Sequence, residues 1–584
     1  MGRRARGAWP LLLLLLLILA AVRCVAPAPA RLIPGPYGGV DAVFQAGLLA
    51  WSARWWLHPA VWSVAPVFYP ATDALWAMDT LLGQGVLVSP LVALGATPAQ
   101  LYDAALLLSL LLAAWAMARL WRTAGGGGPA AASGGVVAAL ALLAAPYTAS
   151  QLGHLNQLPP FLPLLAAALL AEGLTRRRPR RVAAGLLAWG LQPLFGWYGV
   201  VQGGLLLAGV AWGGRRGWRR TVADGGWRWV AVGLLLAVGL LALQAQPYRR
   251  AARSDPGLHP TSARELRWYS ADLQDLPRLG PYHARPTDWL GRGTADPERS
   301  AGAVRRVVHP GWSVLLLGLL GVARRRRLSP ARQGLGSGLL WAGLAGLVFA
   351  FGDSVGLPGT GWRLPLPWGW LRSLAPPLQG YRAVCRFAWP LAVALAWWCG
   401  VAWRDLLMRG RGGRLAAALA ALLLFLEGVP MGVPAVSLPA FPVRATTAPD
   451  RTRPLLSLPA PRREEEVDRG EAAWWLAALR LGRPVTGGAS GRVPEAGRRW
   501  RELVSDPAVD LARVRAAMAR HGITAAVTAA APPASPGRSA WEARLRGAGW
   551  SRRREAAWWI WTPPPGTPAS PDPAAAGSGR RGGG

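Results

Sequence analysis

Hydrophobic stretches long enough to cross a bilayer alternate along this chain with short polar segments. A spanning helix needs roughly 20 apolar residues. The pattern predicts eleven spans, some of them short, at residues 9–28, 101–121, 131–149, 158–174, 182–196, 197–214, 227–247, 310–323, 333–352, 385–404 and 415–431. The first of them could instead be a cleaved signal peptide. We favour an uncleaved span, and both readings place residue 30 outside the cytoplasm.

Arginine clusters separate many of these stretches, at residues 3–6, 119–122, 176–181, 215–220, 324–327 and 404–414. Positive charge beside membrane spans is enriched on the cytoplasmic side. Eleven spans with a cytoplasmic N-terminus put every cluster inside and the C-terminus outside. Because charge and hydropathy are independent signals, their agreement predicts a mainly α, polytopic membrane protein. The exclusive use of arginine as the basic residue, with many Ala, Gly, Pro and Trp, indicates a GC-rich bacterial genome, so we expect the bacterial inner membrane.

The long polar segments all fall on the predicted outer face, at 29–100, 248–309, 353–384 and 432–584. The expected organisation is a first span or signal anchor, a first outer loop with interfacial helices, a multi-span domain, a small extracytoplasmic (periplasmic) α/β domain and a disordered tail, at 1–28, 29–100, 101–431, 432–562 and 563–584. Strands are expected at 455–458, 522–528 and 556–561, and helices at 464–481 and 507–520. Chemistry is expected on the outer face, because functional residues concentrate on loops.

Two helices are expected within the first outer loop. Phe44, Leu48, Trp51 and Trp55 follow the spacing of one helical face, which is typical of an amphipathic helix lying in the membrane interface or of a helix facing a protein core. A second helix is expected over Asp73–Gly83.

The composition changes this picture little. The net charge is +36 and all 65 basic residues are arginine, but much of that charge lies in short loops, so we do not expect a nucleic-acid partner. The 33 Trp residues suit many membrane–water boundaries. The three scattered Cys residues give no disulfide framework or metal-ligand spacing. No Walker-type loop or nucleophile elbow is found, so an ATP-driven pump is not expected.

Two carboxylates in the first outer loop are the strongest chemical candidates. Asp41 follows two glycines and a valine just beyond the first span, where it could act as a general base, hold a cation, or cap a helix. Asp79 lies inside the second expected helix, where a capping role is harder to invoke.

Five further polar residues lie at the outer ends of spans. His154 and Asn156 occupy a turn between two spans, where they could line a ligand or satisfy the turn's own backbone. Arg382 and Arg386, at i, i+4, could grip a phosphate or reach toward lipid head groups. Glu427, at the outer end of the last span, could bind substrate or pair with an arginine.

Taken in order, these motifs resemble the bacterial polytopic glycosyltransferases of the C type (GT-C) and their largely uncharacterised relatives. The matching segments are Gly39-Val40-Asp41, Phe68-Tyr69-Pro70, Asp79-Thr80-Leu81-Leu82-Gly83, Gly153-His154-Leu155-Asn156, Tyr269-Ser270-Ala271-Asp272, Leu364-Pro365-Leu366-Pro367, Tyr381-Arg382, Arg386-Phe387, Leu456-Ser457-Leu458-Pro459 and 482–488. Two departures are that Val40 splits the family's Gly-Asp pair and that Asp79 stands where relatives often carry Glu.

The resemblance implies a GT-C-like fold and transfer of a sugar from a polyprenyl-phosphate-linked donor on the outer face. In such enzymes an acidic residue of the first outer loop is the base or a metal partner, which maps onto Asp41, with Asp79 as the second carboxylate. The expected partners are the lipid-linked donor, membrane lipids and a glycan or protein acceptor; the only cofactor considered is a divalent cation, Mg²⁺ or Mn²⁺. The alternatives are a non-catalytic GT-C-fold protein that handles or translocates lipid-linked glycans, and a small-molecule transporter.

Overall fold

The computed structural model describes residues 32–34, 40–58, 67–68, 71, 74–125, 129–158, 160–255, 261–277, 307–356, 362–428, 435–438, 440–445, 454–458, 474–481, 483–486, 495–506, 508–529, 536–555 and 558–564. The predicted first span therefore lies outside the described residues, as does the predicted tail apart from residues 563–564.

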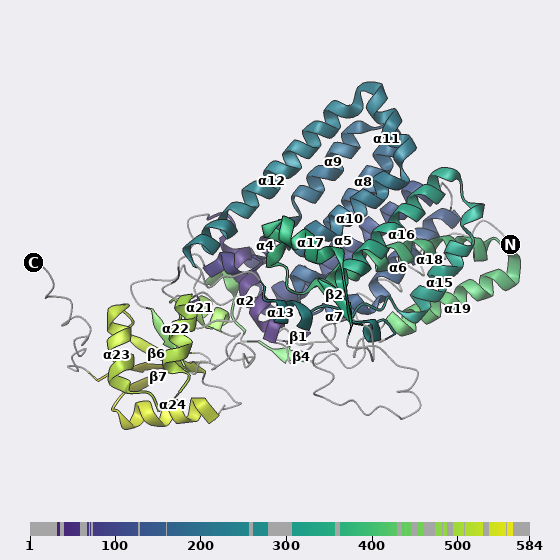
Figure 1. Cartoon of the computed structure of the whole chain (residues 1–584). Coiled ribbons are helices and arrows are strands. Elements are labelled where there is room, and N and C mark those ends of the chain that lie inside the picture. Colours follow the sequence, from purple (N-terminus) through teal and green to yellow (C-terminus); the bar gives the residue numbers. More distant parts are fainter. Residues whose placement is uncertain are drawn as a thin grey trace, which may run out of the picture.

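A bundle of helices forms most of the molecule (Figure 1). Its longer helices are α2 (Val40–Trp55), α4 (Leu82–Ala93), α5 (Pro98–Gly125), α6 (Pro129–Ala144), α8 (Phe161–Thr175), α9 (Pro179–Gly190), α10 (Tyr198–Gly213), α12 (Trp227–Ser254), α15 (Trp312–Ala323), α16 (Pro330–Ala350), α18 (Trp389–Leu407) and α19 (Gly410–Gly428). A helix overlaps each of the ten predicted spans from residue 101 onward.

Short elements connect these helices. They are η2 (Ala74–Ala77), α7 (Pro146–Ser150), η3 (Leu155–Gln157), η4 (Gln192–Leu194), α11 (Arg215–Thr221), η5 (Val222–Gly226), α13 (Ala263–Trp268), η6 (Leu273–Asp275), η7 (Arg325–Arg327), α17 (Pro367–Leu374), η8 (Pro376–Gly380), η9 (Val384–Ala388) and η10 (Val443–Ala445). Two small antiparallel pairs join β1 (Leu32–Pro34) to β4 (Ala435–Ser437) and β2 (Ser354–Gly356) to β3 (Arg363–Pro365).

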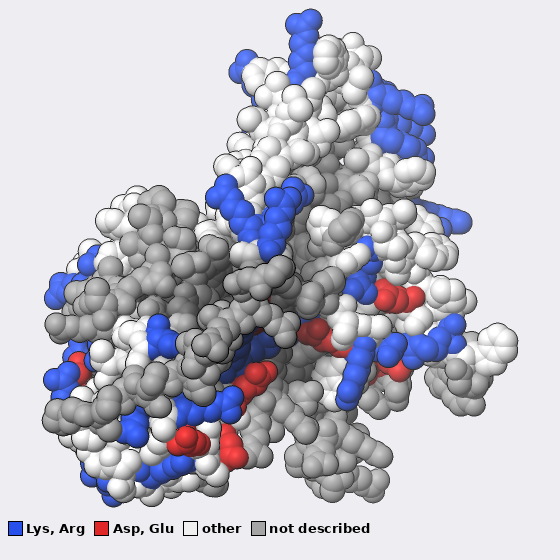
Figure 2. All heavy atoms as spheres, turned by 60° about the vertical axis from the view of Figure 1, so that its left-hand side comes forward, with Lys and Arg blue, Asp and Glu red and all other residues white. Residues whose placement is uncertain are grey.

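Five helices in the described part of the chain are long and apolar enough to cross a membrane, at Pro98–Thr123, Leu155–Thr175, Arg215–Ser254, Pro330–Ala350 and Val384–Leu407. Large apolar side chains on the outside of the bundle are exposed, among them Leu235 (72%), Leu316 (65%) and Leu415 (65%). Such a surface suits lipid rather than water. Figure 2 shows the projecting α11–α12 arm as an uncharged band between two groups of basic side chains. The protein is a polytopic helical membrane protein, as predicted.

Two acidic residues gather arginines at one end of the bundle. Glu172, near the end of α8, forms ion pairs with Arg119 on α5, Arg176 just after α8 and Arg181 on α9. Asp405, near the end of α18, has ion pairs with three further arginines, Arg324, Arg327 and Arg409. Trp121, close to Arg119 on α5, and Asp405 line a common cavity. The arginines around Glu172 and those around Asp405 therefore lie at the same end of the bundle. We call it the arginine end.

The first outer loop differs from its prediction. Residues 42–53 of α2 are buried all round, and α2 packs against α4, α5 and the C-terminal helix α21 (Trp474–Leu481). Of the two readings of its apolar stripe, the core-facing helix is therefore correct. The second expected helix is wrong: η2 ends at Ala77, residues 78–81 are not helical, and α4 begins at Leu82. Leu81 takes a left-handed conformation (φ 51°) there, which interrupts any continuous helix.

A four-stranded sheet forms the C-terminal unit, in the order β5 (Leu455–Ser457), β6 (Ala525–Ala529), β8 (Trp558–Thr562) and β7 (Ser551–Glu555). β5 is parallel to β6, and the other neighbours are antiparallel. Helices α22 (Glu495–Val504), α23 (Leu511–Arg520) and α24 (Pro536–Gly547) accompany it. Trp500, Met518, Trp541 and Trp561 share its buried core. The expected strands at 455–458, 522–528 and 556–561 overlap β5, β6 and β8.

Candidate functional site

The side chains of Asp41 and His154 are in contact at the end of the bundle opposite the arginines. Asp41 lies in the first turn of α2, and its Oδ2 is 3.0 Å from Nε2 of His154, just before η3. The Asp41 side chain is 46% exposed and that of His154 only 14%. The pair therefore joins a largely buried imidazole to a carboxylate that a solute can reach.

Asp79 is held by Asn156, which lies two residues after His154 in the same turn. Asn156 Nδ2 donates to Asp79 Oδ2 at 2.5 Å, and the backbone N–H of Trp197, at the start of α10, donates to Oδ1 at 3.3 Å. Burial raises the pKa of the Asp79 carboxyl, while these two hydrogen bonds and the field of Arg386 limit the rise. The two carboxylates predicted from the sequence are thus brought together by one turn.

Buried glutamines fix this turn. Gln45 on α2 donates from Nε2 to Asn156 Oδ1 (2.8 Å) and accepts from the Leu155 N–H (2.5 Å). Gln84 on α4 donates to the carbonyl oxygens of Leu155 and Phe195 at 3.3 and 2.9 Å. Each buried amide is bonded to the backbone or side chains of the turn, which restricts how the turn can move.

Arg386 and Arg382 lie within electrostatic reach of the two carboxylates. Arg386 lies over the Tyr198 ring at 5.2 Å and interacts electrostatically with Asp79. Among the described residues, its guanidinium has no hydrogen-bond or ion-pair partner. Arg382 instead pairs with Glu265 at 3.3 Å, lies over the Tyr269 ring and interacts electrostatically with Asp41.

The predicted reason for this arginine pair is wrong, although the pair does converge. Residue 382 precedes η9, which begins at Val384, so the two arginines are not one turn apart on an α-helix. Both lie within electrostatic reach of Tyr198. Gln202 donates to the Arg386 carbonyl oxygen at 2.7 Å and holds this segment against α10.

Aromatic rings surround Asp79. Tyr248, near the end of α12, packs edge-on against Trp76 and Trp197 at 5.6 and 5.5 Å. Tyr381 donates from its hydroxyl to the Trp197 carbonyl oxygen at 2.9 Å, and burial raises the pKa of Tyr381, so this hydroxyl stays protonated. The site therefore combines charged groups with several packed aromatic side chains.

Glu427 lies apart from this group. Its carboxylate accepts hydrogen bonds from the backbone N–H groups of Trp312 and Ser313 and from the Ser313 hydroxyl, at the first turn of α15. A carboxylate there satisfies unpaired N–H groups and the helix dipole. Glu427 thus caps α15, and we do not include it among the proposed substrate-binding residues.

Several site residues were not foreseen. Gln45 lies off the apolar stripe of its helix, a position that gives no sign of burial, yet it is only 5% exposed. Tyr248 was placed at the start of an outer loop, but α12 continues to Ser254. Trp76 and Trp197 carried no signal distinct from the many other tryptophans of the chain.

No group of three or more His, Cys, Asp or Glu side chains is placed to hold a metal ion within the described ranges. A divalent cation at the carboxylates stays a prediction.

No family model and no curated protein matches the chain. Among solved structures, the crystal structure of ArnT from Cupriavidus metallidurans bound to undecaprenyl phosphate is similar over 95% of this chain and 98% of that chain. The identity is 14% and the TM-score 0.45, a likeness too weak to establish a common fold or activity.

Proposed function

We propose that the protein is a membrane glycosyltransferase that transfers a sugar from a polyprenyl-phosphate-linked donor to an acceptor on the outer face of the membrane. The observation that carries the proposal is the group formed by Asp41, Asp79 and Arg386 at the bundle end opposite the arginine end. Two anchored carboxylates beside a guanidinium without an ion-pair partner among the described residues match the charge requirements of this reaction.

The donor's phosphate is assigned to Arg386. A guanidinium holds a phosphate through paired, charge-assisted hydrogen bonds, and Arg386 has these donors uncommitted among the described residues. Arg382, which already binds Glu265, adds positive potential. The polyprenyl tail would lie between spans, and the sugar would stack against the aromatic walls formed by Tyr198, Tyr381 and Tyr248.

Asp41 is assigned as the general base. It accepts the proton of the acceptor hydroxyl as that oxygen forms a bond to the anomeric carbon. The bond between that carbon and the phosphate oxygen breaks, and its electron pair leaves with the polyprenyl phosphate, whose charge Arg386 stabilises. A single displacement inverts the anomeric configuration. His154 orients the Asp41 carboxylate through their 3.0 Å contact.

Asp79 is assigned a positioning role as the second carboxylate. It fixes Asn156 and the start of α10, and its negative charge balances Arg386 until a phosphate arrives. If a divalent cation takes part, Asp41 and Asp79 are the residues that would hold it, and it would add positive charge near the leaving phosphate. The C-terminal unit, on the same outer side, would bind the glycan or protein acceptor.

Deletion of the gene and mass spectrometry of lipid-linked sugars and envelope glycans tests the proposal. We expect one lipid-linked sugar to accumulate and one glycan to lose a sugar in the deletion strain. Wild-type protein and Glu502→Gln, an exposed acid on α22, should restore the glycan, whereas Asp41→Asn at equal expression should not. Restoration by both Asp41→Asn and Asp79→Asn would exclude catalysis at this site and favour a protein that only handles lipid-linked glycans.

A further inference from the structure

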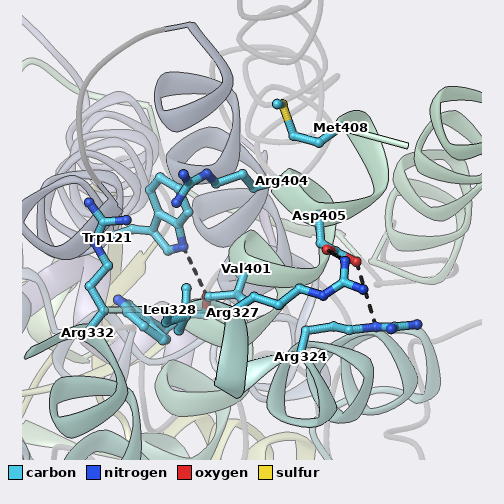
Figure 3. Close-up of a pocket in the computed structure, with 10 residues that line it drawn as sticks. Trp121, Arg324, Arg327, Leu328, Arg332, Val401, Arg404, Asp405 and Met408 are labelled. Atoms are coloured by element: carbon cyan, nitrogen blue, oxygen red, sulfur yellow. Dashed lines mark hydrogen bonds and ion pairs between the residues drawn. The ribbon is translucent and has the colours of Figure 1, made fainter. Parts of the chain in front are cut away.

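A cavity lies at the arginine end, remote from the carboxylates (Figure 3). Its volume is about 140 Å³, roughly ten times the space that one water molecule needs. Helices α5, α16 and α18 and the turn after α15 form its walls. The lining residues are Trp121, Arg324, Arg327, Leu328, Arg332, Trp397, Val401, Arg404, Asp405 and Met408.

Positive charge dominates this cavity, because four guanidinium groups face a single carboxylate. That carboxylate, Asp405, is already shared by Arg324, Arg327 and the neighbouring Arg409 at 3.7, 2.5 and 2.6 Å. One acid therefore neutralises only part of the charge of three bases. The Nε of Arg324 is buried, and no hydrogen-bond acceptor among the described residues reaches it.

Arg332 and Arg404 lie on the other side of the cavity and extend toward Trp121 (Figure 3). Both are half-buried, and each lies within electrostatic reach of the other, so their charges repel. Arg332 has no ion pair with a described residue. A guanidinium that has no ion-pair partner among the described residues, in a partly desolvated cavity beside a second positive charge, costs free energy unless an anion approaches it, and this applies to Arg332.

We propose that this cavity binds a phosphate group, and that the head group of an anionic phospholipid supplies it. A phosphate has several acceptor oxygens, which suit guanidinium groups that converge from two sides. The apolar side chains of Leu328, Val401 and Met408 line the same space and suit the first carbons of a lipid. Basic pockets between spans on the cytoplasmic side are typical sites for anionic lipid head groups.

Free phosphate or a soluble phosphate ester has the same chemistry, so the test must separate the two sources. Delipidated, purified full-length protein would be titrated with phosphatidylglycerol, with diacylglycerol, which lacks the phosphate, and with inorganic phosphate. Bound lipid would be counted by native mass spectrometry, and inorganic phosphate binding would be followed by calorimetry.

We expect phosphatidylglycerol, but not diacylglycerol, to bind the wild type. The double variant Arg332→Gln, Arg404→Gln should weaken that binding by about tenfold or more, the effect of losing a charge-assisted hydrogen bond. The matched control is Arg220→Gln, an exposed arginine of α11 outside the cavity, which should bind like the wild type. A different outcome is that the wild type binds inorganic phosphate, the double variant does not, and both bind phosphatidylglycerol equally. That result would support a phosphate site in this cavity but would show that a soluble phosphate, and not a lipid, occupies it.

Equal affinities for phosphatidylglycerol and phosphate in the wild type, the double variant and the control would overturn the proposal. If the double variant fails to fold, Arg332→Gln and Arg332→Lys replace it. Lipid binding retained by the lysine variant and weakened in the glutamine variant supports the site, whereas equal binding by the two contradicts it.

Discussion

Arg382 and Arg386 differ in whether a carboxylate already neutralises the guanidinium charge. Arg382 pairs with Glu265, whereas the Arg386 guanidinium lies over the Tyr198 ring and has no carboxylate in ion-pair contact among the described residues. Binding a phosphate at Arg382 would compete with an existing ion pair. Binding one at Arg386 displaces no carboxylate, so the two arginines should contribute unequally.

Arg386→Gln is therefore expected to raise the KM for a polyprenyl-phosphate donor by about 10- to 100-fold, the loss of one or two charge-assisted hydrogen bonds. Arg382→Gln should raise it less. Steady-state kinetics of the purified variants measure both. A larger effect at Arg382 than at Arg386 would contradict the assignment of the phosphate.

Asp79 makes stability depend on pH in a defined direction. Because folding raises the pKa of its carboxyl from 3.8, the folded state binds the proton more tightly than the unfolded state. That contribution is fully present below pH 3.8 and is lost as the pH rises through the folded-state pKa. At higher pH the charged carboxylate must remain in a half-buried position.

The side chain introduced by Asp79→Asn stays neutral at every pH. The melting temperature of this variant minus that of the wild type should therefore increase as the pH rises from about 4 to 8. Tryptophan fluorescence during heating, in one detergent across the pH series, gives the difference. A difference that falls with rising pH would show that the carboxylate is stabilised, not destabilised, by its surroundings.

For single residues, the sequence predicted the ionisable and strongly polar members of the site well and most of its other neutral members poorly. Asp41, Asp79, His154 and Asn156 stood out because ionisable or strongly polar groups are expensive beside a membrane. Gln45 and Tyr248 did not, since an amide or a phenol is common in a buried helix and its partner depends on the tertiary fold. The approach of Arg386 to Asp79 joins two segments 307 residues apart and has no local signal.

Among the helices, the contact between α10 and α16 depends on glycine. Gly209 and Gly213 on α10 face Gly338 and Gly334 on α16, and a Cβ at any of the four would overlap a carbonyl oxygen of the other helix. Small residues at this spacing let two membrane helices approach closely. The contact supports the site, because α10 carries Tyr198 and Gln202.

Gly338→Ala should lower the free energy of unfolding by about 1–3 kcal/mol, the usual cost of overpacking. Gly239→Ala is the matched control, because a Cβ at that position of α12 meets nothing within 4 Å. The control should be neutral or stabilising by up to about 1 kcal/mol, since alanine favours helix. Thermal or denaturant unfolding measures both, and equal effects would contradict the close helix contact.

The amphipathic stripe of α2 illustrates a limit of periodicity. Phe44, Leu48 and Trp51 predicted one buried face, and the spacing alone could not separate a lipid surface from a protein core. Once α4, α5 and α21 cover it, the opposite face is buried as well, including Gln45 and Ser52. Hydropathy located helix segments well because a long apolar run has few alternatives in a membrane.

Over the whole molecule, the arginine end and the carboxylate site occupy opposite ends of the bundle. The ion pairs of Glu172 and Asp405 collect arginines from α5, α9 and the segments beside α8, α15 and α19. The site is built from α2, η3 and the starts of α10 and η9. The positive-inside bias predicts an orientation in which the site and the C-terminal unit lie outside.

Single cysteines test this orientation in a background where Cys24, Cys385 and Cys399 are replaced by alanine. Arg513→Cys, on the exposed side of α23, should react with a membrane-impermeant maleimide in intact spheroplasts. Arg220→Cys, on α11, should react only after the membrane is permeabilised. Labelling in the reverse order would put the carboxylate site in the cytoplasm and exclude an outer-face reaction.

The most direct measurement is donor turnover by the purified, full-length protein in lipid nanodiscs. A panel of polyprenyl-phosphate-linked hexoses and pentoses would be offered with an envelope glycan extract, and released polyprenyl phosphate would be followed by mass spectrometry. Our account predicts release from at least one donor, slowed about 10²- to 10⁴-fold in Asp41→Asn and unchanged in Glu502→Gln. Equal release by the wild type and Asp41→Asn, or no release from any donor that binds the wild type, would contradict catalysis at this site.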